Sequence, residues 1–179
     1  MTNPNLALLE EAVGLLEPLL GDLVFAGGCA TGLLVTDSAA PDIRPTRDVD
    51  AIADVISYAQ YTTLSERLHS LGLREDSSEG APLCRWRRGS LRVDILPTDE
   101  RILGFSNRWY APAIRTARHA IVGPHTIRVI TAPYFLATKL EAFHGRGGGD
   151  YRASQDRLPL LLRRLGAIAS ANEPPLTHI

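Results

Sequence analysis

Apolar positions recur at helical spacing in several stretches of the chain. Leucines and valines repeat every three or four residues over residues 5–20 and stop at Gly21. A second amphipathic pattern covers residues 58–71, and a third begins after Thr131, which is a good N-cap, and runs to about residue 144. These patterns predict three helices. Shorter apolar stretches suggest further helices over residues 30–35 and 156–169.

Other stretches have the short runs and two-residue alternation of β-strands. The predicted strands cover residues 23–26, 49–53, 83–88, 91–96 and 127–130, and the third and fourth form a hairpin around Arg88-Gly89-Ser90. This order of elements predicts an α+β (α/β mixed) fold, a small mixed β-sheet flanked by helices with further C-terminal helices. No repeat or long linker interrupts the 179 residues, so we expect a single domain with a core at about 22–130 and a helical part at about 131–170.

Composition narrows the class of protein. The hydrophobic fraction of 45% is that of a soluble globular protein, and the longest apolar runs, such as residues 158–162, are too short to span a bilayer. The N-terminus has no basic flank of a secretory signal, so we expect a cytoplasmic protein with no membrane partner. Cys29 and Cys84 lie far apart with no His or Cys at metal-ligand spacing, which predicts buried structural thiols and neither a disulfide nor a zinc site.

Charge is divided unevenly along the chain. Residues 1–100 carry 8 basic and 16 acidic side chains, whereas residues 101–179 carry 11 basic and 4 acidic ones. The basic half could form a surface that meets phosphates, or the two halves could simply attract one another within the fold. Lys139 is the only lysine in the sequence.

Candidate chemistry centres on Asp48 and Asp50. Two residues apart on a predicted strand, they project from one face and repel one another unless a cation lies between them. Carboxylate oxygens suit Mg²⁺, and Asp94 on another predicted strand would complete a set of three that can hold two metal ions. In this interpretation Asp94 also accepts the proton of an attacking hydroxyl. The alternative is a solvated strand face without a metal.

Three further features fit a phosphate-bearing substrate. Gly27 and Gly28 lie between a predicted strand and a helix, where the backbone can approach a phosphate. Lys139 lies on a helix and could neutralise a leaving pyrophosphate, or it could be an ordinary surface lysine. Arg146, seven residues later, could share that face. Trp86 could stack on a base beside its arginines, although packing on the sheet is the favoured interpretation.

Several of these segments resemble the polymerase-beta-type nucleotidyltransferase superfamily, and within it the AbiEii/MenT-like group, the toxins of type IV toxin–antitoxin systems. The resemblance rests on residues 25–30 with residues 44–50, where a Gly-Gly turn precedes an Asp-x-Asp pair, and on Asp94 at the third acidic position. Residues 134–143 are similar to the family helix whose lysine reaches the nucleotide phosphates, here Lys139. Residues 149–156 resemble the start of its next helix, with Asp156 as the best match to a functional Asp and Asp150 as the second.

The resemblance covers about residues 22–165 and implies a nucleotidyltransferase fold and a magnesium-dependent enzyme. Such an enzyme moves a nucleoside monophosphate from an NTP to an acceptor hydroxyl, here the tRNA 3′ end, and has a cognate antitoxin protein as partner. A second hypothesis is a small-molecule nucleotidyltransferase of the antibiotic-modifying kind. Arginines near the site would favour RNA, whereas an acidic acceptor pocket would favour a cationic drug. A third hypothesis is an inactive binding module, which Pro159 keeps open because the family usually has an acid there.

Overall fold

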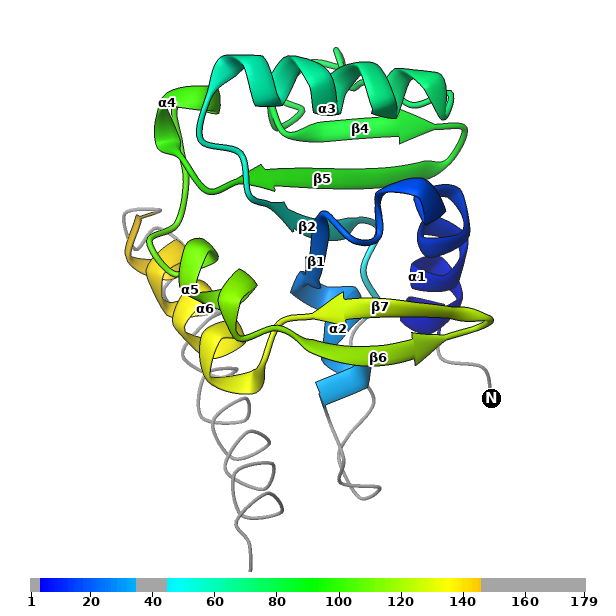
Figure 1. The fold of residues 1–179 in the computed structure, drawn as a ribbon, viewed down its shortest axis with the longest axis vertical. Helices are drawn as coiled ribbons and strands as arrows, with labels where there is room; N and C mark the ends of the chain where they lie inside the picture. Colours follow the sequence, from blue (N-terminus) through cyan, green and yellow to red (C-terminus); the bar gives the residue numbers. More distant parts are fainter. Residues whose placement is uncertain (1–3, 35–44, 146–179) are drawn as a thin grey trace, which may run out of the picture.

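A seven-stranded mixed sheet forms the centre of the computed structural model, which describes residues 4–34 and 45–145. The strand order is β3-β4-β5-β2-β1-β7-β6 (Figure 1). The strands are β1 (Leu23–Ala26), β2 (Val49–Ala53), β3 (Arg74–Glu75), β4 (Arg85–Arg88), β5 (Leu91–Pro97), β6 (Arg118–Val122) and β7 (His125–Val129). The helices are α1 (Pro4–Leu15), the 3₁₀ turn η1 (Glu17–Leu19), α2 (Gly27–Leu34), α3 (Tyr58–Ser70), α4 (Glu100–Leu103), α5 (Tyr110–Arg115) and α6 (Ala132–Gly145).

The middle of the sheet combines both kinds of strand pairing. β1 runs antiparallel to β2, β2 runs parallel to β5, and β7 joins β1 in parallel. Antiparallel hairpins, β4–β5 and β6–β7, extend the sheet on its two sides. The chain leaves β2 through α3, which lies along β4 in Figure 1, before it returns as the hairpin that contains β5.

Strands β1 and β2 lie in the hydrophobic core, and one carboxylate, Asp50, interrupts them. All four residues of β1 are buried, and in β2 every residue is buried except Asp50, which is partly buried. Strands covered on both faces are continuously apolar, so an acid at this position is costly. The environment of Asp50 is therefore not that of a solvated strand face.

The predicted α+β class and mixed sheet are confirmed, and so are the predicted strand at 49–53 and the hairpin. The prediction of one helix over residues 5–20 is wrong: α1 ends at Leu15 and a 3₁₀ turn follows, because Pro18 cannot donate the backbone hydrogen bond that a continued helix needs. The helix expected at 30–35 begins earlier, at Gly27. The pattern gave no signal for α4, α5 or β6.

Two further expectations concern the environment of the chain. Cys29 and Cys84 are free and buried, as predicted. Over the two stretches 4–34 and 45–145, no helix has the length and apolarity to cross a membrane. The predicted helix over 156–169, and with it Asp156, Asp150, Pro159 and Arg146, lies outside the described residues.

Candidate active site

Strand register brings the three predicted carboxylates together. Asp50 of β2 pairs with Asp94 of β5 in the parallel ladder, and Asp48 directly precedes β2. The charges of Asp48 and Asp94 both raise the pKa of Asp50. The strand carrying Asp94 therefore lies beside the strand carrying Asp50, which is the condition for the carboxylates to approach one another.

The environment of Asp50 strongly perturbs the pKa of its carboxyl. Burial is the largest cause and raises its pKa to about 6, and the negative charges of the other two carboxylates act in the same direction. The ammonium of Lys139 is the strongest opposing influence on that pKa. Lys139 on α6 therefore faces the acidic cluster, and its Nζ also lies 5.6 Å from the centroid of the Phe135 ring.

The glycine pair makes room for protein side chains. Gly27 has φ +66°, and a Cβ on it would lie 1.6 Å from Oδ2 of Asp50. A Cβ on Gly28 would lie 3.0 Å from Cβ of Thr46. The space beside Gly27 is therefore filled by Asp50 itself, so this glycine is needed for the carboxylate as well as for the turn from β1 into α2.

Asp48 is positioned by residues from two helices and a loop. The Thr46 hydroxyl donates to Oδ1 of Asp48 at 2.8 Å, and the Thr46 backbone N–H donates to Oδ1 of Asn5 in α1 at 2.9 Å. The thiol of Cys29 in α2 donates to the backbone carbonyl of Asp48 at 3.4 Å. The loop before β2 is thereby tied to both helices that flank it.

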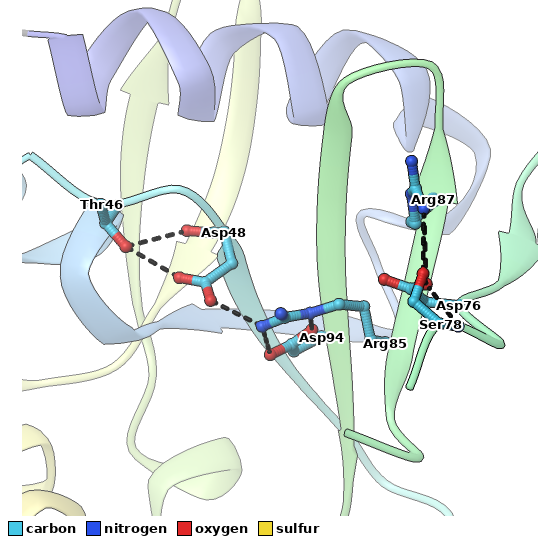
Figure 2. Close-up of polar contacts among 7 residues, drawn as sticks. All are labelled: Thr46, Asp48, Asp76, Ser78, Arg85, Arg87 and Asp94. Atoms are coloured by element: carbon cyan, nitrogen blue, oxygen red, sulfur yellow. Dashed lines mark hydrogen bonds and ion pairs between the residues drawn. The ribbon is translucent and has the colours of Figure 1, made fainter. Parts of the chain in front are cut away.

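Arg85 of β4 connects two of the carboxylates (Figure 2). Its Nε donates to Oδ1 of Asp94 at 2.8 Å, its Nη2 donates to Oδ2 of Asp94 at 2.8 Å, and the same Nη2 donates to Oδ2 of Asp48 at 2.7 Å. These hydrogen bonds, above all with Asp94, raise the pKa of Arg85 further above its already high value. Sequence reasoning missed this residue. The hairpin turn at Gly89 was a usable signal, because counting outward from it pairs residue 85 with residue 94.

The arrangement does not form a ready metal site. Within 4–34 and 45–145, no three Asp, Glu, His or Cys side chains are grouped so that they could hold a metal ion. The chemistry of the three carboxylates suits Mg²⁺, but the Arg85 guanidinium already binds both oxygens of Asp94 and one of Asp48. The predicted magnesium site therefore remains a prediction.

A cavity of about 450 Å³ lies beyond the carboxyl ends of β2 and β5. Asp54 and Thr98 of its lining directly follow β2 and β5, four residues after Asp50 and Asp94 respectively. The Thr98 hydroxyl donates to Oδ1 of Asp54 at 3.1 Å. Ten residues line the cavity: Asp54, Ile56, Thr98, Asp99, Glu100, Ser106, Asn107, Arg108, Ala111 and Glu141.

This lining is strongly acidic. It includes four carboxylates and a single basic side chain, Arg108, which pairs with Glu141 at 2.7 Å. Asp99 is paired with Arg101, which is not part of the lining. The cavity therefore suits a cationic ligand better than an anionic one.

Trp86 does not stack on a base. Its side chain is fully buried, and the His69 ring meets it edge-on with 5.1 Å between ring centroids. The indole Nε1 has no hydrogen-bond partner within the described part of the chain. The packing interpretation is confirmed, and the base-stacking alternative is wrong.

Comparison with known proteins supports the fold. No protein-family profile matches the sequence, and none of the curated proteins matches it significantly. Among solved structures, an antigenic nucleotidyltransferase-like protein from Paracoccidioides brasiliensis superimposes with a TM-score of 0.59 at 15% identity, covering 95% of this chain and 87% of its own. ANT(2″)-Ia in complex with adenylyl-2″-tobramycin superimposes with a TM-score of 0.53 at 14% identity, covering 94% of this chain and 98% of its own. The chain therefore has a nucleotidyltransferase fold.

Proposed function

We propose that the protein transfers a nucleoside monophosphate from an NTP to an acceptor hydroxyl and releases pyrophosphate. The observation that carries this proposal is the convergence of Asp48, Asp50 and Asp94, with Lys139 facing them, in a nucleotidyltransferase fold. A strand buried on both faces gains nothing in stability from a carboxylate with a raised pKa. Such a costly residue is typical of a functional site.

Each site residue has a role in the proposed transfer. Lys139 contacts the triphosphate and neutralises charge that develops on the leaving pyrophosphate. Gly27 and Gly28 shape the pocket for that triphosphate. Asp94 takes the acceptor proton once its oxygens are free of Arg85. Mg²⁺ held by the three carboxylates would supply the charge neutralisation that triphosphate binding requires.

Two residues outside the described part complete the proposal. Arg146 assists phosphate binding, and Asp156 supports the phosphate region or the acceptor. The role of Arg146 comes from its spacing of seven residues after Lys139, and that of Asp156 from the sequence resemblance. The AbiEii/MenT-like relationship and an antitoxin partner also come from the resemblance alone.

The acidic cavity favours a small acceptor that carries both hydroxyl and amino groups. The excess of carboxylates that remains after Glu141 and Asp99 are paired with arginines would repel the phosphates of an RNA 3′ end and attract ammonium groups. The structural likeness to ANT(2″)-Ia, solved with an adenylylated tobramycin, agrees with this choice. A tRNA acceptor is the second candidate, and the exposed Arg87 and Arg88 of β4 are the observation in its favour.

A labelling experiment tests the proposal. The protein is incubated with Mg²⁺ and each labelled NTP in turn, with either tobramycin or total RNA as acceptor, and compared with Asp48→Ala. Asp76→Ala is the matched control, because Asp76 also accepts hydrogen bonds from a hydroxyl and an arginine but belongs to a separate cluster (Figure 2).

Label that enters one acceptor with wild type and Asp76→Ala, but not with Asp48→Ala, supports the transfer and identifies the acceptor class. Absence of label in both acceptors with all four NTPs, together with no NTP binding, would contradict the proposal and favour an inactive module.

A further inference from the structure

Every oxygen of two site carboxylates already has a hydrogen-bond donor. Oδ1 of Asp48 accepts from Thr46 and Oδ2 from Arg85, while both oxygens of Asp94 accept from Arg85. No hydrogen bond to the side chain of Asp50 occurs among the described residues. One guanidinium and one hydroxyl thus occupy one lone pair on each of the four oxygens that a metal ion would use.

The contact between Arg85 and Asp94 is largely removed from water. The Arg85 side chain is 15% exposed and the Asp94 side chain 9% exposed. Two parallel N–H···O bonds in this setting form the strongest kind of ion pair, and removing one partner leaves the other as an uncompensated buried charge. Arg85 is therefore built into the site rather than lying on its surface by chance.

A guanidinium and a metal ion compete for the same oxygens. A divalent cation between Asp48 and Asp94 would compete with the guanidinium for the lone pairs that face it, and its charge would repel that of Arg85. The free energy lost from the hydrogen bonds of Arg85 is subtracted from the free energy of metal binding.

We propose that Arg85 is an internal counter-ion that holds Asp48 and Asp94 together in the metal-free protein and is displaced when a divalent cation binds. Arg85 thereby lowers the metal affinity of the site. For the proposed nucleotidyl transfer, Arg85 is a positioning residue. The functional part rests on the proposed function, whereas the competition between guanidinium and metal can be measured without any substrate.

The chain offers a matched control on the same strand. Arg87 lies two residues after Arg85, on the same face of β4, but its guanidinium contacts Asp76 and Ser78 and not the site (Figure 2). Arg85→Gln and Arg87→Gln remove the same charge from one strand and differ in contact with the carboxylates. The effect of losing one positive charge is present in both variants. The difference between their Mn²⁺ affinities therefore reports the contact of residue 85 with the carboxylates.

Titration calorimetry of Mn²⁺ binding, with no nucleotide present, tests the proposal. We expect Arg85→Gln to bind Mn²⁺ about tenfold more tightly or better than wild type, and Arg87→Gln to match wild type. We also expect the metal-free Arg85→Gln protein to have a lower Tm than wild type, and Mn²⁺ to raise that Tm more than it raises the Tm of wild type. Mn²⁺ affinity that is unchanged or weaker in Arg85→Gln, or no Mn²⁺ binding by any variant, overturns the proposal.

Two measurements guard against a variant that fails to fold. Arg85→Lys keeps the charge but not the two-pronged contact, and we expect intermediate tightening. In wild type, the Arg85 Nε–H signal followed by NMR should shift or exchange faster when Mg²⁺ is added, and an unchanged signal at saturating Mg²⁺ overturns the proposal. Wild type that transfers label while Arg85→Gln binds Mn²⁺ no more tightly defeats this inference and leaves the proposed function standing.

Discussion

The carboxylate of Asp50 fills the space into which a side chain at Gly27 would project. A Cβ at residue 27 would lie 1.6 Å from Oδ2 of Asp50, at a backbone φ of +66°. We expect Gly27→Ala to lower the free energy of unfolding by about 2 kcal/mol or more, because it combines backbone strain with a displaced acid. Urea unfolding measures this change.

Gly14 in α1 is the control for that substitution. No heavy atom lies within 4 Å of a Cβ at this position, so Gly14→Ala should leave stability unchanged or raise it by up to about 1 kcal/mol. Equal effects of the two substitutions would contradict the tight fit between residue 27 and Asp50.

Asp50 should make stability fall as pH rises. Burial raises the pKa of Asp50 from its ordinary value of 3.8 to about 6, so between these values the folded state binds more protons than the unfolded state. This contribution to the free energy of unfolding therefore decreases from about pH 4 to about pH 6 and stays low above it. Asp50→Asn should be more stable than wild type at pH 7.5, by up to about 3 kcal/mol.

The comparison is made by urea unfolding from pH 4 to pH 8. The advantage of Asp50→Asn should become small toward pH 4, where the carboxyl is protonated in the folded state and close to its ordinary pKa of 3.8 in the unfolded state. Asp54→Asn, in the exposed position directly after β2, controls for the removal of one negative charge. A wild type that is as stable as Asp50→Asn at pH 7.5 would rule out the raised pKa of Asp50.

The effect of Lys139 on the site should be measurable as a change in the pKa of Asp50. Its ammonium lowers the pKa of Asp50, so Lys139→Met should move that pKa further above 6. Carboxyl ¹³C chemical shifts followed against pH measure this value without any activity. Under the proposed function the KM for NTP should also rise about tenfold or more. Arg108→Gln removes an exposed charge that pairs with Glu141 and should leave the Asp50 titration unchanged.

The two thiols should be inert in the folded protein. Burial, assisted by the neighbouring carboxylates, raises the pKa of Cys29 and of Cys84 to about 12. Because the thiolate is the reactive form, we expect neither to react with an aromatic disulfide reagent at pH 8 until denaturant is added. Rapid reaction of one thiol in native buffer would show that its part of the site opens readily.

The acidic cavity predicts how acceptors are discriminated. Asp54→Asn and Glu100→Gln remove lining charges without touching Asp48, Asp50 or Asp94. If the acceptor is amine-bearing, each should raise its KM several-fold and leave the KM for NTP unchanged, since each lost ion pair is worth about 1 kcal/mol. If RNA is the acceptor, the same variants should leave its KM unchanged or lower it.

The sequence was sufficient to predict the strands of the site. β2 has a polar-apolar alternation at its start, and a Gly-centred turn fixes the β4–β5 hairpin. Convergence of Asp50 with Asp94 depends on β2 pairing with β5 in parallel, which no local pattern specifies and only the resemblance suggested. The place of Arg85 against Asp94 follows from the hairpin register, but one arginine among several exposed neighbours gives no signal of its own.

The cavity could not be predicted for a different reason. Its lining comes from the ends of β2 and β5, from α4 and α5 with the loop between them, and from α6, each giving only a few residues. Short elements such as α4 are too brief to show a hydrophobic period. An acidic surface of this kind exists only after the sheet has brought those ends together.

The pairing of Arg85 with Asp94 within one hairpin also affects how the protein reaches its native state. The two residues are nine positions apart, so the hairpin can bring its own neutralising charge when β5 docks on β2. Repulsion between Asp94 and the two earlier carboxylates is reduced at the step where β5 pairs in parallel with β2. We therefore expect newly synthesised chains to assemble this centre without a divalent cation, so that under the proposed function metal binding follows folding.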